Sequence, residues 1–127
     1  SLFVGSVRFV LETVIISILL VETKLNIDEL FLKIKKIEKK LGRTKSKRNH
    51  PRICDIDIID FNGEIIRRKL GNHELNTPHK RMHNRNFVLF PLYELDKDWV
   101  HPKLNKNIVI LMSNLTSDQL LGIKIAQ

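Results

Sequence analysis

Two aspartates separated by one residue form the pattern in this sequence that is best suited to chemistry. Asp55 and Asp57 stand in "ICDIDIIDF", residues 53–61, a β-branched run typical of a strand. Side chains at i and i+2 of a strand share a face, with their Cα atoms about 7 Å apart. Mg²⁺ accepts one or two such carboxylates together with waters and phosphate oxygens. Taken alone, the pattern favours the solvent face of an edge strand, and Asp60 keeps this interpretation as it enters a turn. For Asp55 and Asp57, the cations that precede the strand shift the interpretation to a metal-assisted phosphate site.

A strongly basic segment leads into this strand. Residues 33–52 hold ten cations against one acid, Glu38, so their net charge of +9 exceeds the +8 of the whole chain. Cations beside paired carboxylates suit a nucleotide site, because a triphosphate and Mg²⁺ balance both signs. The alternatives are a solvated helix face and a basic nucleic-acid-binding module. The module is disfavoured because paired aspartates repel a phosphate backbone and aromatic platforms are scarce, with one Trp and one Tyr in the chain.

A second cluster of titratable residues lies in "TPHKRMHNR", residues 77–85. His79 and His83 have the i, i+4 spacing of zinc ligands, but no glutamate follows His79 and no third ligand is evident, so zinc is disfavoured. A histidine and an arginine, His79 and Arg85, fit the phosphate end of a nucleotide better. Phe87 is either a ring platform or a core residue, and the pattern alone favours the core.

Length and composition predict one folded domain. A chain of 127 residues with 43% hydrophobic content is long enough for one core and is not disordered. Cys54 is the only cysteine, so it is expected to fill the core of a protein of the reducing cytoplasm. The apolar stretch "VIISILLV", residues 14–21, is much shorter than the roughly 20 residues of a membrane span and has no signal-peptide pattern.

The clearest helix is expected over "NIDELFLKIKKIEKKLG", residues 26–42. Asn26 and Glu29 have capping-box spacing, and Gly42 suits the C-terminal stop. Glu38 lies on the predicted buried side, where a carboxylate needs a cationic partner, and an arginine of the following loop is expected to supply it. The apolar face has helical period and comprises Ile27, Leu30, Phe31, Ile34, Ile37 and Leu41.

The strands predict an α+β architecture. "VIISILLVE", residues 14–22, lacks alternation, which is typical of a central strand covered on both faces. After the strand at 53–61, Asn62-Gly63 predicts a type I′ hairpin that returns into "EIIRRKL", residues 64–70. Helical turns follow near residues 78–95 and 107–115. We therefore expect helices packed on a small, mostly antiparallel sheet.

Three separated blocks resemble one enzyme family. "IEKKLGR", "PRICDIDIIDFNG" and "TPHKRMHNRNFVLFPLYEL" are similar to IExxLGR, PRxxDLDI and PHxxMxxRxFVLxPL of the 6-hydroxymethyl-7,8-dihydropterin pyrophosphokinase (HPPK) family. The resemblance implies a ferredoxin-like α/β sandwich. It also implies transfer of pyrophosphate from the co-substrate ATP, with two Mg²⁺ ions, to the hydroxymethyl group of the dihydropterin, releasing AMP in folate biosynthesis.

The resemblance also assigns roles by position. Asp55 and Asp57 match the ligands of both Mg²⁺ ions, and Asp55 also borders the pterin. Phe87 matches an aromatic wall of the pterin slot. His79 and Arg85 match the pair at the triphosphate. The further matches are the phosphate-reaching Arg43 and Arg52, the ATP-binding loop cations Lys45 and Arg48, and the glutamate Glu38.

The N-terminal region departs from the family pattern. The family begins with a strand ending in a Gly-Ser-Asn turn, a helix and a long loop, whereas only thirteen residues precede the strand at 14–22. We therefore treat 1–127 as one HPPK-like domain in which 1–13 is aberrant or truncated and 14–127 is family-like. Val14 and Ile16 stand where an aromatic and an asparagine grip the pterin, and Asn49 replaces a frequent tryptophan.

The departures from the family pattern lead to an alternative function and to a prediction about association between copies of the chain. The alternative is an inactive remnant that binds Mg-ATP only, because apolar side chains leave the amide edge of a pterin without partners. A monomer is expected, although a missing strand would leave an unpaired sheet edge through which copies of the chain associate.

Overall fold

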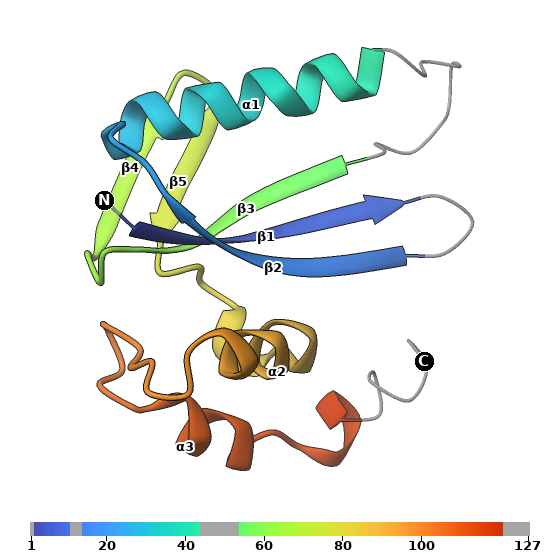
Figure 1. Cartoon of the computed structure of the whole chain (residues 1–127), viewed down its shortest axis with the longest axis vertical. Helices are drawn as coiled ribbons and strands as arrows, with labels where there is room; N and C mark the ends of the chain where they lie inside the picture. The colour runs from blue at the N-terminus through green and yellow to red at the C-terminus, as the bar shows by residue number, and fades with distance from the viewer. Residues whose placement is uncertain (1, 11–13, 44–53, 121–127) are drawn as a thin grey trace.

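The computed structural model describes residues 2–10, 14–43 and 54–120, and it places helices on both sides of a small sheet (Figure 1). Helix α1 (Ile27–Arg43) covers one face, while α2 (Asn86–Leu95) and α3 (Ile108–Ser113) lie on the other, as expected for an α+β sandwich with ferredoxin-like layers. The elements are β1 (Leu2–Val10), β2 (Val14–Glu22), α1 (Ile27–Arg43), β3 (Cys54–Phe61), β4 (Ile66–Leu70), β5 (His73–Thr77), the 3₁₀ turn η1 (Met82–Asn84), α2 (Asn86–Leu95) and α3 (Ile108–Ser113).

The main sheet has the strand order β2-β1-β3, and both pairings are antiparallel. Strand β1 is therefore central and belongs to the segment 1–13 that departs from the family pattern. The prediction that residues 14–22 form a central strand is wrong, because no described strand pairs with the outer edge of β2. Leu19 and Leu20 are accordingly about half exposed, at 49% and 53%. An apolar run shows that a strand is hydrophobic, but its neighbours are decided by the chain that pairs with it.

The predicted turn at Asn62-Gly63 is present, but its second strand pairs elsewhere. Both residues have positive φ, 54° and 69°, and the Glu64 N–H donates to the Phe61 carbonyl at 2.9 Å, as in a type I′ turn. Strand β4 then pairs with β5, from Ile66↔Thr77 to Leu70↔His73. The predicted hairpin between β3 and β4 is therefore wrong, and the turn instead redirects the chain into a separate two-stranded ribbon.

Helix α1 begins as predicted and ends later. Its first turn is capped by Asn26, whose side-chain oxygen accepts the Glu29 N–H at 2.9 Å. The helix continues through Gly42 to Arg43, so the predicted stop at Gly42 is wrong. Ile37 and Leu41 are 42% and 40% exposed, which contradicts their predicted place on the buried face. The reason is that Ile34 is the last residue of α1 in the apolar cluster between this helix and the sheet.

Each face of the sheet carries its own core. The cluster beneath α1 consists of Ile27, Leu30, Phe31, Ile34, Ile58, Phe61 and Leu75. The cluster on the α2 and α3 side consists of Ile18, Ile59, Met82, Val88, Leu89, Leu92, Trp99, Ile108, Leu111 and Leu115. The neighbours Ile58 and Ile59 of β3 point into opposite cores, as the pleat of a strand requires. This strand therefore holds the two helical layers together.

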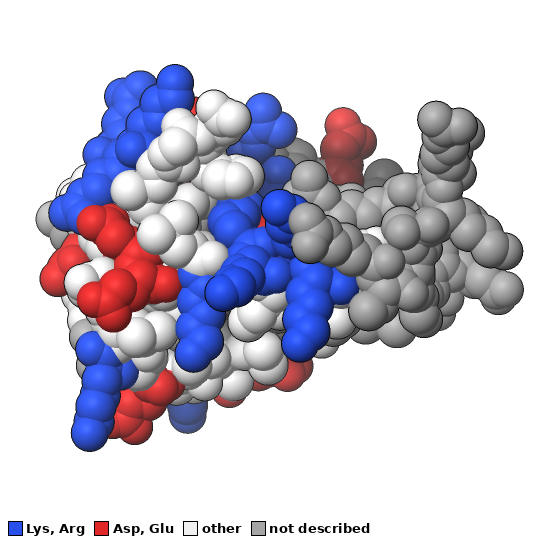
Figure 2. Space-filling model, turned by 90° about the horizontal axis from the view of Figure 1, so that it is seen from above, with Lys and Arg blue, Asp and Glu red and all other residues white. Residues whose placement is uncertain are grey.

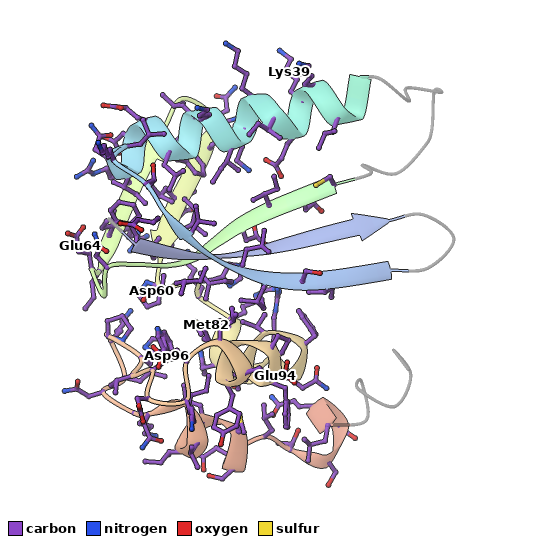
Figure 3. The ribbon with its side chains drawn as sticks, viewed as in Figure 1. Lys39, Asp60, Glu64, Met82, Glu94 and Asp96 are labelled. Carbon is purple, nitrogen blue, oxygen red and sulfur yellow. The ribbon has the colours of Figure 1, made fainter. Side chains whose placement is uncertain are left out.

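A β-bulge in β3 turns Asp60 inward. The register shifts between Gly5↔Ile58 and Val4↔Asp60, which leaves Ile59 as an extra residue and reverses the alternation beyond it. Asp60 is consequently 8% exposed, and its carboxylate accepts the Trp99 Nε1–H at 3.1 Å and the Gly63 N–H at 3.2 Å. Figure 3 labels it on the α2 side of the sheet. The interpretation of Asp60 as a solvent-facing turn residue is wrong.

A buried histidine organises the segment between α2 and α3. The Nδ1 atom of His101 accepts the backbone N–H groups of Lys103 and Leu104 at 3.2 and 3.1 Å. Its ring lies edge-on to Trp99 at 5.7 Å between centroids. Burial, with the nearby charges of His83 and Lys103, lowers the pKa of His101 to about 4.

Within the three described ranges, no helix combines the length and the apolar character of a membrane span.

Replacing Asp60 is expected to destabilise the fold. Asp60→Ala leaves the buried Trp99 Nε1–H without an acceptor, which lowers the free energy of unfolding by about 2 kcal/mol. Urea denaturation followed by tryptophan fluorescence measures this loss. Asp98→Ala removes an exposed carboxylate of the same segment and is the control, with a change of less than about 0.5 kcal/mol. Equal stabilities of the two variants would contradict the role of Asp60.

The buried His101 predicts a stability loss in acid. Because its pKa falls from an unfolded value of about 6.5 to about 4 on folding, the unfolded chain binds more protons between these values. The stabilisation is complete above pH 6.5 and is lost as the pH falls towards 4, by an amount on the order of 3 kcal/mol. His101→Asn keeps an acceptor but does not titrate. Urea titrations from pH 4 to 7 should show a steeper decline for the wild type, and parallel curves would refute the assignment.

Candidate functional site

A pocket of about 310 Å³ opens beside the outer edge of β3, between α1, β5 and the segment that leads into α2. Its polar and charged lining consists of Lys35, Asp57, Glu74, Asn76, His79, Lys80, Arg81 and Arg85. Its apolar lining consists of Phe31, Ile56, Ile58 and Leu75. We call this cavity the front pocket. It combines an apolar floor with a rim of charges, as small-molecule sites do.

The outer edge of β3 is closed by two hydrogen bonds that come from other elements. The buried Glu38 of α1 accepts the Ile56 N–H at 2.9 Å. The Ile59 carbonyl accepts the His79 N–H at 2.9 Å. No strand among the described residues pairs with this edge, so these bonds satisfy backbone groups that a further strand would otherwise take. They also fix α1 and His79 relative to the aspartates of β3.

Glu38 has the cationic partner that its buried position requires. Lys35 Nζ lies 3.0 Å from Glu38 Oε1, and both residues belong to α1. The predicted partner was an arginine of the following loop, and residues 44–53 lie outside the described part of the chain. A lysine three residues before a buried glutamate is itself a sequence signal, because i, i+3 side chains on a helix are neighbours.

His79 is held as a neutral donor that faces Asp57. Its Nδ1 atom accepts the Arg81 N–H at 3.2 Å, which leaves the ring proton on Nε2. Nε2 lies 4.0 Å from the Asp57 carboxylate, whose side chain is 50% exposed. Burial lowers the pKa of His79, and the charges of Arg85 and Arg81 add to this effect, while Asp57 opposes it. The Nε2–H group is therefore available to a ligand oxygen at neutral pH.

Arg85 and Phe87 form a stacked pair at the start of α2. The Arg85 guanidinium lies 5.5 Å from the centroid of the Phe87 ring. Phe87 is 39% exposed, so the interpretation of this residue as core is wrong. The reason is the helical period, since Val88 and Leu89 of α2 face the core and turn Phe87 away from it. Arg85 itself lines the front pocket.

The charges around the front pocket favour an anionic ligand. Four cations, Lys35, Lys80, Arg81 and Arg85, line it with only two carboxylates, Asp57 and Glu74. Lys80 and Glu74 neutralise each other at 3.3 Å, and Lys35 is paired with Glu38 at 3.0 Å, which leaves Arg81 and Arg85 beside Asp57. The side chain of Asn76 and then Lys80 lower the pKa of Glu74. Viewed from the α1 side, Lys and Arg side chains gather in several groups on the described surface, with Asp and Glu side chains at one end of it (Figure 2).

The structure brings together only part of the predicted site. Asp57, His79 and Arg85 meet at the front pocket, and Phe87 is linked to it through Arg85. Asp55 lies one i, i+2 step before Asp57 and is partly buried, but it is not in the lining. Four predicted phosphate contacts lie outside what the structure describes. They are the side chain of Arg43 and the residues Lys45, Arg48 and Arg52. Asn49 also lies outside the described residues.

Sequence patterns did not select several residues of the front pocket. Lys80 and Asn76 lie at or just after the end of β5, and Phe31 comes from α1, with Lys35 Nζ 5.3 Å from its ring centroid. The described lining includes no residue of β2 and therefore not Ile16, while the side chain of Val14 lies outside what the structure describes. These residues come together through the packing of β5 and α1 on β3, which no short motif encodes.

His79 and His83 face different partners. His79 faces Asp57, while the ring of His83 lies 6.1 Å from that of His101. In the part of the chain that is described, no group of three His, Cys, Asp or Glu side chains is arranged to hold a metal. The i, i+4 spacing of the two histidines therefore reflects two different environments.

Comparison with known families decides the affiliation of the chain. The model of the family described as 7,8-dihydro-6-hydroxymethylpterin-pyrophosphokinase (HPPK) matches residues 12–97. The chain belongs to the HPPK family. The match contains every residue of the front pocket and leaves β1 and α3 outside the matched range. The HPPK pattern thus accounts for the site, while the central strand of the sheet lies before it.

Curated relatives agree with this affiliation. The chain is 40% identical over 89 residues to the 2-amino-4-hydroxy-6-hydroxymethyldihydropteridine pyrophosphokinase of Aquifex aeolicus, covering 70% of this chain and 53% of that protein. The enzyme of the same name from Haemophilus influenzae is 39% identical, with coverage of 65% and 49%. Folic acid synthesis protein FOL1 of Dictyostelium discoideum is 42% identical over 67% of this chain and 12% of its own. The match thus spans about half the length of the two bacterial enzymes.

Removing the carboxylate of Glu38 is expected to loosen the edge of β3. Glu38→Ala leaves the Ile56 N–H without its acceptor and Lys35 without its partner, which lowers the free energy of unfolding by about 2 kcal/mol and accelerates amide exchange at Ile56. Glu38→Gln retains an acceptor and should lose less. Urea denaturation and hydrogen exchange measure both effects. Glu94→Ala, an exposed carboxylate on α2 (Figure 3), is the control, and an Ile56 amide unchanged in Glu38→Ala would disprove the bond.

Proposed function

We propose that this chain transfers pyrophosphate from ATP to the hydroxymethyl group of 6-hydroxymethyl-7,8-dihydropterin, releasing AMP. Its membership of the HPPK family supports this activity, as do relatives named as the corresponding pyrophosphokinase. The structural observation that carries the proposal is the front pocket, where Asp57, His79 and Arg85 meet beside a mainly cationic rim. This arrangement suits a reaction in which phosphate charge must be held in place.

In this proposal the front pocket receives ATP. Its volume of about 310 Å³ lies at the lower end of the range for ligand sites. Phe31, Ile58 and Leu75 offer apolar surface to the base, and Asn76 offers hydrogen-bonding groups to its edge. The phosphates extend towards His79 and Arg85, because these donors lie at the charged part of the rim. The family pattern adds Arg43, Lys45, Arg48 and Arg52 as further cations for the phosphates.

The donor set around Asp57 fits Mg²⁺. Asp57 is half exposed and lines the pocket, and Asp55 precedes it by two positions on the same strand. Mg²⁺ needs only one or two carboxylates when phosphate oxygens and waters complete its shell, so two aspartates are enough. We assign both ions of the family to Asp55 and Asp57. When bound, Mg²⁺ would neutralise phosphate charge and draw electron density from the attacked phosphorus.

In this proposal the side chains of the front pocket act by positioning the phosphates of ATP and by balancing their negative charge. The planar guanidinium of Arg85 donates two parallel hydrogen bonds to a phosphate, and its stacking on Phe87 limits its rotation. His79 donates its Nε2–H to a second phosphate oxygen without needing to be protonated. With ATP so held, the pterin hydroxyl attacks the β-phosphorus in line and the new O–P bond forms. The bond from the β-phosphorus to the oxygen that bridges to the α-phosphate breaks, AMP leaves with that oxygen, and the hydroxyl proton passes to water. Phe87 and Asp55 are assigned to the pterin side of the site.

We further propose a monomer that works in the cytoplasm. Cys54 is 1% exposed, and burial raises the pKa of its thiol, so it is a core residue and not a reactive one. Association between copies would use the outer edge of β2, where Leu19 and Leu20 are exposed and no described strand pairs.

AMP formation is the decisive assay. With ATP, Mg²⁺ and 6-hydroxymethyl-7,8-dihydropterin, the wild type should release AMP, and Asp55→Ala or Asp57→Ala should lower the rate about a hundredfold or more, because each removes a charge that positions the phosphates. Asp98→Ala is the exposed control with unchanged rate. Calorimetric titration with Mg-ATP is run in parallel.

The two measurements separate the possible outcomes. AMP release that survives Asp57→Ala would refute the assigned site. A folded wild type that binds Mg-ATP without releasing AMP would identify the inactive remnant that keeps only the nucleotide half. A folded chain that neither binds Mg-ATP nor releases AMP would refute the proposal as a whole.

A further inference from the structure

A second cavity lies behind the segment that forms one wall of the front pocket. It has a volume of about 280 Å³, and Asn76, His79 and Lys80 line both cavities. Its other walls come from the start of β4 with the residue before it, from the segment between β5 and α2, and from the segment between α2 and α3. We call it the back pocket. The nucleotide chemistry proposed above does not use it.

The composition of the back pocket combines positive charge with apolar surface. Arg67, Lys80 and Lys103 supply three cations from three separate segments. Among the described residues no Asp or Glu lines this cavity, in contrast to the front pocket. Its apolar surface includes Ile65 and Leu104. Lys80 is paired with Glu74, so Arg67 and Lys103 are the cations that no carboxylate of the described lining balances, and their charge favours an anionic occupant.

The buried His101 adds a fixed, neutral donor to this wall. It is 3% exposed, and its Nδ1 atom already accepts two backbone N–H groups from Lys103 and Leu104. The ring proton therefore resides on Nε2, and the low pKa keeps the ring neutral at pH 7. A histidine held in this way offers one N–H and no charge. His83, whose ring lies 6.1 Å from that of His101, also lines the cavity.

The apolar part of the cavity restricts the ligand further. Its volume of about 280 Å³ is close to that of the front pocket, so the two cavities differ in their lining and not in their size. The aliphatic surface of Ile65, Ile66 and Leu104 gives no partner to a bare inorganic ion but can bury a compact hydrocarbon group.

We propose that the back pocket is a second ligand site, which binds a small organic anion with one carboxylate or phosphate group joined to a compact apolar body. The anionic group lies among Arg67, Lys80 and Lys103, and the apolar body lies against Ile65 and Leu104. Neither the family pattern nor the proposed reaction requires this site. Its occupation is therefore independent of whether the chain transfers pyrophosphate.

Benzoate is the probe, and amide NMR of the ¹⁵N-labelled full chain is the measurement. Titration at pH 7 and constant ionic strength should shift the amides of Lys103 and Leu104 together with the imidazole signals of His101, and the shifts should saturate. Inorganic phosphate, which lacks the apolar body, should bind at least about tenfold more weakly, because it loses the burial of a hydrocarbon group.

Matched variants test the geometry. Lys103→Ala should weaken benzoate binding about tenfold, the usual effect of losing one hydrogen bond to a charged group. Lys97→Ala removes the same charge from an exposed position outside both cavities and should change the affinity less than about twofold. Thermal melts of both variants verify folding. Because Lys103 is exposed, its replacement is expected to leave the fold intact.

Each alternative outcome would overturn the proposal. Shifts confined to Asp57 and Ile58 would place the anion in the front pocket. Shifts that do not saturate, or that Lys103→Ala and Lys97→Ala weaken equally, would reduce the effect to non-specific attraction. Equal binding of phosphate and benzoate would show that the apolar wall takes no part. Because the titration contains no ATP or pterin, loss of the proposed enzyme activity would not change its result.

Discussion

The backbone of β3 is the constraint on which the rest of the structure depends. One edge of this strand pairs with β1, and the other is closed by Glu38 and by the backbone of His79. Each of these bonds satisfies a backbone group in a partly buried setting, where an unpaired group is costly. The same two contacts bring α1 and the residues before α2 to the aspartates. The front pocket is therefore a consequence of how a strand edge is closed.

The bulge in β3 explains how one short strand serves two cores and a site. Before the bulge, alternation sends Ile58 towards α1. Beyond it, the reversed alternation turns Asp60 towards Trp99, and the carboxylate ties the turn after β3 to the segment that follows α2. A strictly regular strand would place Asp60 on the opposite face. The helical layer beneath the sheet is thus anchored by a polar contact as well as by apolar packing.

Around the front pocket, positive and negative side chains lie close together, but only some of them form ion pairs. Lys35 is paired with Glu38, and Lys80 with Glu74, whereas Asp57 remains half exposed at 4.0 Å from a neutral His79. The lowered pKa of His79 follows from burial next to two arginines, and it leaves a donor without adding charge. A region of this kind binds a polyanion with its metal ions more favourably than it binds either sign alone.

Short-range patterns in the sequence were enough to predict the local features of this protein. Some features depend only on neighbouring residues, and short-range patterns therefore predicted them. They are the start of α1, the extent of β3 and the turn at Asn62-Gly63. The HPPK blocks around Asp57 and His79 are likewise short stretches of sequence. The tertiary structure was needed to show that β1 is central, that β4 pairs with β5, that Asp60 is buried, and that Lys35 and Lys80 join the site. These features depend on which distant segments pair and on one extra residue in a strand. The free energy of such contacts is shared between segments far apart in the chain, and no single stretch of sequence records it.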